Sequence, residues 1–492
     1  MLRWLKQLIP SRKRPQPSQT VFQALRLIKA RYDAAATTEE NRRHWANADD
    51  LSANAANSPQ VRHLLRVRCR YEVANNSYAR GIVLTLANDV VGTGPRLQML
   101  TGSAGANRRI EAEFALWART VRLAERLRTL RMARAADGEA FALLTSNPAL
   151  PTAIKLDLKL VEADQVTTPD LPLDADNAVD GIVFDAHGNP VEYHVLRQHP
   201  GERFVKLDFE YRRVPAESVI HVFRSDRPGQ ARGIPDITPA LPLFAHLRRY
   251  TLAVITAAEI AALPGGILYT DAPPNGEADA VEPMDLIELE RGMLMTMPGG
   301  WRMSQMEANQ PSTTYAEFKR EILGEIGRCL LVPVNVLTGD SSRHNYASGR
   351  LDHQAYFKSI RVEQSQLEAV VLDRILAAWF DEASLLSGFL PDGLGPWGTW
   401  PRTWMWDGAS HVDPLKEANA QSVRLASHTT TLADEYARIG LDWETQVRQR
   451  AKEHALLRSL GLITESASAI SVDEETDDEE VLDETPARAP RA

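Results

Sequence analysis

The sequence has 492 residues, of which 44% are apolar and 25% are charged, and this composition is typical of a globular protein with several domains or one elaborate domain. Its two cysteines, Cys69 and Cys329, exclude a disulfide framework and a cysteine-based metal site, and they fit a reducing compartment. The formal net charge of −9 is unevenly placed, because residues 473–484 alone hold nine acids and no base.

Both ends of the chain are strongly charged. Residues 1–30 carry seven Lys or Arg and no acid, and we expect 1–20 to be a basic arm without a signal-peptide cleavage pattern. The acidic end, 464–492, cannot bury a core and is expected to be a disordered tail. Two ends of opposite sign indicate two different kinds of partner.

The region from residue 21 to about residue 90 is predicted to be helical. Ile82, Leu86 and Val90 follow one another at a spacing of four, which places them on one face of a helix that ends at Gly92. A second amphipathic pattern, over 107–138, predicts one more long helix.

The pattern changes to β after Gly138. Five stretches with alternating or β-branched residues predict strands, and DAHGNP within the third predicts a hairpin turn. They are EAFALLTSN (139–147), IKLDLKLVEADQV (154–166), GIVFDAHGNPVEYHVL (181–196), FVKLDFEYRRVP (204–215) and SVIHVFRS (218–225). The sequence therefore predicts an α+β fold.

A long helix is predicted to follow, with Asp236 as its N-cap. It runs into the Ala-rich segment 251–270, which contains Glu259 and a Pro-Gly-Gly break and is too short to cross about 30 Å of hydrocarbon. We expect a helix with small residues for close packing, then short strands around an acidic insert, then a helix over 312–330.

The stretch VPVNVLTGDSSRHNYASGR, residues 332–350, separates two helical patterns. Its polar run includes two side chains able to bind an anion, Arg343 and His344, and loops of this length are usually functional. The next helix is predicted to span about 30 residues, and its apolar stripe is Phe357, Ile360, Leu367, Val371 and Ile375. A Trp-, Pro- and Gly-rich stretch and a last helical region, 414–460, complete the chain.

The sequence contains no P-loop, HExxH, CxxC or GxSxG pattern. The Gly-rich segment 91–96 ends a helix and does not open one, so it is a poor phosphate cradle. His221 alternates with apolar neighbours and is expected to be a satisfied sheet histidine. Asp137 and Glu139 have the chemistry of an acid–base pair, but a turn into a strand explains them more simply.

Four tryptophans lie in the Trp-rich stretch: Trp397, Trp400, Trp404 and Trp406. Aromatic side chains can stack on nucleic-acid bases. We expect that they instead bury a connecting segment against the rest of the protein.

Four stretches carry a resemblance to a known family. They are NNSYARGIVLTLANDVVGTG (75–94), DGEAF (137–141), VPAESVIHVFRSDRPGQARGIPDITPAL (214–241) and LLVPVNVLTGDSSRHNYASGRLD (330–352). In this order they resemble the lambda-type portal proteins of tailed bacteriophages, over roughly residues 20 to 380. The C-terminal third is similar to the family in character only.

The resemblance implies a cyclic ring of twelve subunits at one capsid vertex, with wing, stem, clip and crown parts. The implied parts are wing 21–235, stem helices 236–263 and 312–330, clip 264–311, tunnel loop 331–347, long wing helix with the Trp/Pro/Gly-rich connection 348–413, and helical crown 414–463. The ring would pass double-stranded DNA in packaging and ejection, without catalysis, cofactor or metal. It would belong to the virion, and to the host cytoplasm during assembly.

The resemblance also implies partners. They are further copies of the chain, double-stranded DNA without sequence preference, the terminase large subunit, major capsid and scaffolding proteins, and head-tail connector proteins, with no stable membrane insertion. The tunnel loop would meet phosphates through its backbone and Ser341, Ser342, Arg343, His344 and Asn345. The clip would face the terminase with Glu277, Asp279, Glu282, Asp285, Glu288 and Glu290. The overall acidity fits a channel that lets a polyanion slide.

Two other interpretations stay open. An enzyme, such as a nuclease or a protease fused to a capsid component, is disfavoured by the missing metal-ligand and nucleophile motifs. A non-catalytic capsid scaffolding or membrane-surface assembly protein is the alternative suggested by MLRWLKQLIPSRKR, residues 1–14, which could lie on an anionic surface.

Overall fold

The computed structural model describes residues 35–168, 177–202, 210–262, 266–270, 301–305, 314–408 and 414–462. The chain divides into two compact units, residues 1–58 and 59–492. The described part of the first unit contains one short α-helix, α2 (Ala53–Ala56), whose N-cap Ser52 accepts a hydrogen bond from the Ala55 amide. The α-helices and strands described below belong to the second unit.

The second unit begins with helices that confirm the first predicted apolar face. They are α3 (Pro59–Asn75) and α4 (Ser77–Val91), and they are followed by strand β1 (Arg96–Met99). Asn76 caps α4 by accepting a hydrogen bond from the Tyr78 amide at 3.0 Å. Ile82, Leu86 and Val90 are all at most 3% exposed, so the predicted stripe is the buried face of α4.

The prediction of a single long helix over 107–138 is wrong, because the helix is interrupted. The structure has two helices, α5 (Ala104–Thr120) and α6 (Leu123–Asp137), separated by Arg122 in the left-handed conformation at φ 52°. Val121 and Leu123 are both buried, at 1% and 3% exposed. Residues two apart on a straight helix point away from each other, so the break is what lets both enter the core.

Two antiparallel sheets confirm the predicted α+β class. A three-stranded sheet has β2 (Glu139–Ser146) at its centre, between β3 (Leu156–Val161) and β8 (Val219–Phe223). A four-stranded sheet runs in the order β4 (Ala178–Val179), β5 (Ile182–Phe184), β6 (Pro190–Leu196), β7 (Tyr211–Pro215). The predicted hairpin turn lies between β5 and β6, with Gly188 at φ 84°.

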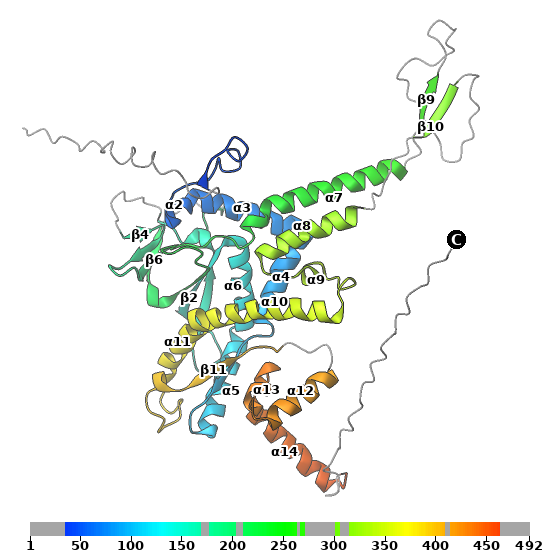
Figure 1. The fold of residues 1–492 in the computed structure, drawn as a ribbon. Helices are drawn as coiled ribbons and strands as arrows, with labels where there is room; N and C mark the ends of the chain where they lie inside the picture. Colours follow the sequence, from blue (N-terminus) through cyan, green and yellow to red (C-terminus); the bar gives the residue numbers. More distant parts are fainter. Residues whose placement is uncertain are drawn as a thin grey trace, which may run out of the picture. The chain divides into compact units, whose positions relative to one another are not determined.

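Asp236 does not cap the next helix, contrary to prediction. A 3₁₀ turn, Thr238–Ala240, precedes α7 (Leu241–Ala262), and Asp236 is 2% exposed. Its carboxylate lies 3.1 Å from Arg131 and 3.3 Å from Arg224. An unpaired buried carboxylate would destabilise the fold strongly, so this side chain pairs with arginines and does not cap the helix. Helix α7 packs along α8 (Tyr315–Cys329), and the strands β9 (Gly266–Thr270) and β10 (Trp301–Gln305) pair with each other (Figure 1).

The stretch 332–350 is less irregular than predicted. It contains a short helix, α9 (Val334–Thr338), which starts after Pro333 and ends at Gly339. The long helix begins at Tyr346 as α10 (Tyr346–Leu367), passes through a π-helical segment (Glu368–Leu372) and continues as α11 (Asp373–Ser384). Phe357, the first residue of the predicted stripe, is half-buried. The other four residues of the stripe are buried: Ile360, Leu367, Val371 and Ile375.

Two of the four tryptophans are buried and two are half-buried against the core, as predicted for a segment that packs on the rest of the protein. Trp400 and Trp404 are 5% and 8% exposed, and Trp397 stacks on Phe380 with ring centroids 5.3 Å apart. The indole N–H of Trp404 donates to Asp373 at 3.1 Å, and that of Trp406 donates to Glu368 at 2.6 Å. This stretch also forms β11 (Arg402–Met405), which pairs with β1 and ties the connection to the first helices.

Three helices complete the described chain. They are α12 (Pro414–Ala426), α13 (Leu432–Arg438) and α14 (Trp443–Ser459). The corner between α13 and α14 contacts β1, where the side chain of Gln98 donates to Asp442 at 2.7 Å. The predicted basic arm and acidic tail lie outside the described residues.

Candidate functional site

The polar segment 339–345 joins α9 to α10 as a compact turn. The Asp340 carboxylate accepts a hydrogen bond from the Ser342 amide at 2.9 Å. The His344 amide donates to the Ser341 carbonyl at 3.0 Å. Hydrogen bonds from the Ser342 backbone and side chain hold the pKa of the exposed Asp340 below its usual value. The turn is therefore a defined local structure even though it is polar throughout.

The tip of this turn is exposed and its end caps the long helix. Asn345 accepts a hydrogen bond from the Ser348 amide at 2.8 Å, which satisfies one amide at the start of α10. Four of the five predicted DNA-facing residues are exposed: Ser341, Ser342, Arg343 and Asn345. His344 is half-buried, with Nε2 3.6 Å from the Asp352 carboxylate, so it is turned toward α10.

The base of the turn is packed, in contrast to its tip. Val332 and Leu337 are 4% and 9% exposed, and the Asn335 side chain contacts His353 at 3.0 Å. A Cβ at Gly327 would lie 2.5 Å from the Val332 carbonyl, so α8 and the chain leading into α9 approach each other too closely for any side chain there. The exposed polar tip therefore stands on a closely packed base. Its short polar side chains and one guanidinium group can contact a ligand.

The predicted clip acids lie outside the described residues. They are Glu277, Asp279, Glu282, Asp285, Glu288 and Glu290. The structure does describe the two strands on either side, β9 and β10, whose register sets Thr270 opposite Trp301.

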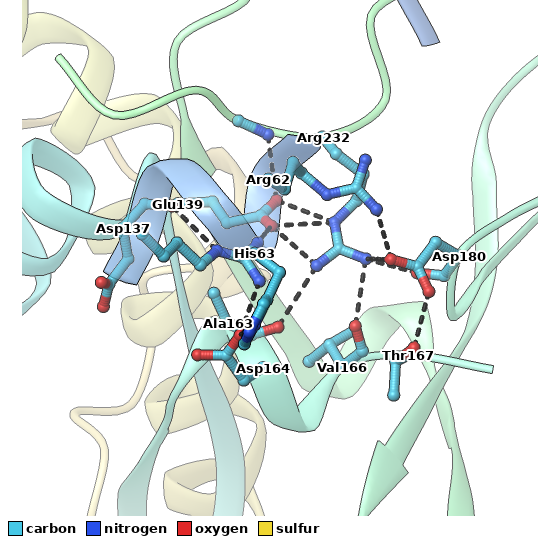
Figure 2. A network of polar contacts seen from close by, with 12 residues as sticks. Arg62, His63, Asp137, Glu139, Ala163, Asp164, Val166, Thr167, Asp180 and Arg232 are labelled. Atoms are coloured by element: carbon cyan, nitrogen blue, oxygen red, sulfur yellow. Dashed lines mark hydrogen bonds and ion pairs between the residues drawn. The ribbon is translucent and has the colours of Figure 1, made fainter. Parts of the chain in front are cut away.

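A second polar site, which the sequence did not reveal, is a buried arginine–carboxylate network (Figure 2). Helix α3 contributes Arg62, Arg66 and Arg70, spaced by four residues and therefore on one face. Arg62 pairs with Asp180, and Arg70 lies 2.6 Å from Asp137. The network joins α3 to the end of α6 and to both sheets.

Glu139 is the centre of this network. It is 0% exposed and pairs with Arg66 and Arg232, with Arg232 at 2.7 Å. Its carboxylate also accepts hydrogen bonds from the Gly233 amide at 3.0 Å and contacts His221 Nε2 at 3.0 Å. Asp137 ends α6 and Glu139 begins β2, which agrees with the simpler interpretation of a turn into a strand. Arg70 binds the Asp137 carboxylate, and Arg66 and Arg232 bind that of Glu139.

Arg232 fixes the chain that crosses between the sheets. It donates to the Val166 carbonyl at 3.0 Å and to the Ala163 carbonyl at 3.3 Å, and it contacts Asp180 (Figure 2). Burial first, and the neighbouring Arg232 second, lower the pKa of Arg62 to about 10. The arginine spacing in VRHLLRVRCR (61–70) was the one sequence signal for this network, because charges repeated every fourth residue share a helix face.

The pKa values of Glu139 and His221 both depart from their usual range. Burial alone would raise the pKa of Glu139, but the Arg232 guanidinium and the hydrogen bond with His221 hold it well below its usual value. Burial lowers the pKa of His221, although its contact with Glu139 acts in the opposite direction. The predicted satisfied sheet histidine is confirmed, and His221 stacks on Phe141 at 4.3 Å between ring centroids.

We expect the stability of the protein to fall as the pH drops below about 6.5. The unfolded chain protonates His221 near that pH, whereas the folded chain resists it until lower pH, so acid favours the unfolded state by up to about 1.4 kcal/mol per pH unit for this one proton. His221→Gln keeps a donor for Glu139 but does not titrate, so its urea midpoint should change less between pH 7 and pH 5 than that of the wild type. Equal changes would contradict the assignment.

A smaller network lies where α6, α10 and the start of α7 meet. Arg131 binds Glu363 at 2.7 Å and Asp236 at 3.1 Å, and Arg134 binds Glu363 at 3.3 Å. Glu363 lies on α10, the helix that follows the polar turn. The support of the turn and the base of α7 are therefore held by the same buried ion pairs.

Three side chains with metal-ligand chemistry lie close together: Glu162, Asp164 and His199. Asp164 is already bound by Arg66 at 3.1 Å and by Arg70 at 2.7 Å. Two guanidinium groups on the Asp164 carboxylate satisfy its charge, and the three side chains form the edge of the arginine network.

Among the described residues, no helix is long and apolar enough to cross a membrane.

Comparison with known proteins identifies the family. The model of the lambda-family phage portal proteins matches residues 39–364. A probable portal protein of Halomonas phage phiHAP-1 is 27% identical over 456 residues, which cover 84% of this chain and 86% of the relative. The chain belongs to the lambda family of phage portal proteins.

Solved structures with some similarity come from gene transfer agent particles. One is the neck of a native particle with C12 symmetry, at 14% identity and TM-score 0.45, covering 78% of this chain and 94% of that one. Another is the neck of an empty particle with C6 symmetry, at 18% identity and TM-score 0.45, covering 76% and 92%.

Proposed function

We propose that the protein forms a closed ring of twelve copies at one vertex of a phage capsid, and that double-stranded DNA passes through the ring in packaging and ejection. Membership of the portal family supports this role. The structural observation that carries it is the polar tip at 341–345, exposed at every residue but the half-buried His344, on its buried base. Short polar side chains and backbone amides contact phosphates without reading bases, which suits DNA of any sequence.

In this proposal the parts of the ring follow the elements. Helices α7 and α8 form the stem, residues 264–311 form the clip, and the turn after α9 is the tip of the tunnel loop. The wing comprises residues 21–235 and the long helix of α10 and α11, and the crown comprises 414–463. The protein works in the virion, after assembly in the host cytoplasm with capsid and scaffolding proteins, and head-tail connector proteins bind it later.

The surface of α7 supports association with further copies. Leu252 and Ile255 are 55% and 48% exposed in the single chain, and Phe318 on α8 is 51% exposed. Apolar groups gathered on neighbouring helices are typical of an interaction surface. A conduit requires a heterologous contact that closes into a ring, not a two-fold dimer.

We expect Ala257→Phe to impair ring assembly more than it impairs folding of the chain. Ala257 lies on α7 among small residues, and the added ring would prevent close approach of a neighbouring helix. Light scattering after size-exclusion chromatography measures the assembly, and circular dichroism measures the folding. The matched control is Ala186→Phe in the exposed hairpin turn, which should assemble normally. Normal rings from both variants would contradict the proposed stem contact.

The clip is proposed to dock the packaging motor, the terminase large subunit. It carries six acids in 277–290, followed by Arg291, and a rim of one charge sign favours steering and salt-sensitive association. Glu282→Lys with Asp285→Lys should weaken binding of the terminase at low salt while rings still form. Reversal of Asp477 and Asp478, two acids of the tail, is the control and should leave binding unchanged. Unchanged binding by the clip variant in surface plasmon resonance would count against this docking face.

A further inference from the structure

A groove with a volume of about 890 Å³ lies beside β1. Helix α5, the start of α6 and the start of α14 form its walls, and the corner of α13 and α14 is fastened to β1 by the Gln98–Asp442 hydrogen bond and by Arg96, which donates to the Gly440 carbonyl. The apolar part of its lining includes Leu97, Phe114, Leu123 and Met405. The channel role proposed above does not involve this groove.

Positively charged side chains outnumber negatively charged ones in the groove. Five arginines line it, namely Arg96, Arg108, Arg119, Arg122 and Arg128, against three acids. Among the described residues, only Arg122 of these five makes an ion pair, a 3.5 Å contact with Glu125 between two exposed side chains. Arg96 and Arg128 donate to backbone carbonyls, and Arg108 and Arg119 are exposed.

The acids of the lining are already engaged. Glu111 accepts a hydrogen bond from the Met99 amide at 2.7 Å. Asp442 accepts hydrogen bonds from Gln98 and from the Thr445 amide at 2.9 Å. The groove therefore presents an apolar floor and more arginines than acids on its rim, which is the complement of an acidic peptide that carries a few apolar side chains.

We propose that this groove binds the acidic segment 473–484 of the same chain. The segment reads DEETDDEEVLDE and places Val481 and Leu482 between Glu480 and Asp483. The two apolar side chains suit the floor and the flanking carboxylates suit the arginine rim. A groove of this volume holds a few residues, so the Val-Leu pair with its neighbouring acids is the part that docks.

The chain between the groove and the segment is long enough for this contact. Thr445, at the start of α14, lines the groove, and α14 leads away from it for about 25 Å at 1.5 Å per residue. Residues 463–480 follow the described chain and reach about 60 Å when extended. The segment can return to the groove beside the first turn of the helix that precedes it.

The test uses the full-length protein with a photo-crosslinking amino acid in place of Leu482. We expect crosslinks within one chain to groove residues between 93 and 128, located by mass spectrometry. Arg108→Glu with Arg119→Glu should lower their yield several-fold, and so should 0.5 M salt, because exposed charge pairs are screened. The same probe in place of Ala489, outside the acidic segment, should give few crosslinks to the groove.

The matched control is Arg68→Glu with Arg80→Glu, which reverses two exposed arginines away from the groove and should leave the yield unchanged. Crosslinks elsewhere, or a yield that the groove variant does not change, would overturn the proposal. A crosslinked product of twice the chain mass would assign the groove to a neighbouring copy and would also overturn it. If the groove variant loses DNA retention while its crosslink yield is unchanged, the groove binds nucleic acid and the proposal is overturned.

Discussion

Particles whose portal lacks residues 340–344 should package or retain far less DNA than wild-type particles, although the ring still forms. The deletion removes most of the polar tip and keeps Asn345, which caps α10, and Gly339, which ends α9. The buried base, with Val332 and Leu337, is untouched, so the folded chain should lose little stability. The quantity to measure is DNA per particle, with ring integrity checked by electron microscopy.

A single substitution in the same tip should have a smaller effect. Arg343→Ala removes one exposed guanidinium, and a single solvated phosphate contact contributes about 1 kcal/mol or less. A variant with glycine at each position from Ser341 to His344 keeps the length of the turn. Comparing it with the deletion separates the effect of the missing side chains from the effect of a shorter turn. Wild-type packaging and retention with 340–344 deleted would show that the segment is only a connector.

Glu139→Ala should lower the free energy of unfolding by about 3–5 kcal/mol, the cost of leaving a buried charge without its partner. The substitution leaves Arg232, 1% exposed, and Arg66, 5% exposed, without their shared carboxylate. It also removes the acceptor for the Gly233 amide and the partner of His221. Urea denaturation followed by tryptophan fluorescence measures the change.

Two controls separate charge from packing at this site. Glu139→Gln keeps the side-chain volume, so a loss nearly as large as that of the alanine variant assigns the effect to the missing charge. Glu125→Ala breaks an exposed pair with Arg122 and should cost about 0.5 kcal/mol or less. A loss by Glu139→Ala as small as this would mean that the arginines find other partners or water.

The elements that the sequence predicted well are those encoded by local periodicity. Two such faces are buried, the one formed by Ile82, Leu86 and Val90 and the stripe from Ile360 to Ile375. Apolar residues at helical spacing lie on one side of the helix, and that side packs against the core. The strands around β2 followed from alternation in the same way. The exposed tip of the polar turn followed from Gly339 and the run of short polar residues after it.

Features that depend on distant partners could not be predicted. Arg131 and Glu363 are 232 residues apart in the chain, and Glu139 meets Arg232 across 93 residues. No local pattern records such pairs, so Asp236 looked like a helix cap when it is a partner of arginines. The break at Arg122 carries no glycine or proline and is set by the need to bury Val121 and Leu123 together.

The proposed function requires that the turn at 339–345 lies inside a closed ring. The most direct measurement is a cryo-electron microscopy reconstruction of the purified full-length protein. We expect a ring of twelve copies around an open channel, with Ser341 to Asn345 of every copy at its narrowest point. A particle without a closed ring, or a ring with these residues on its outer surface, would contradict it.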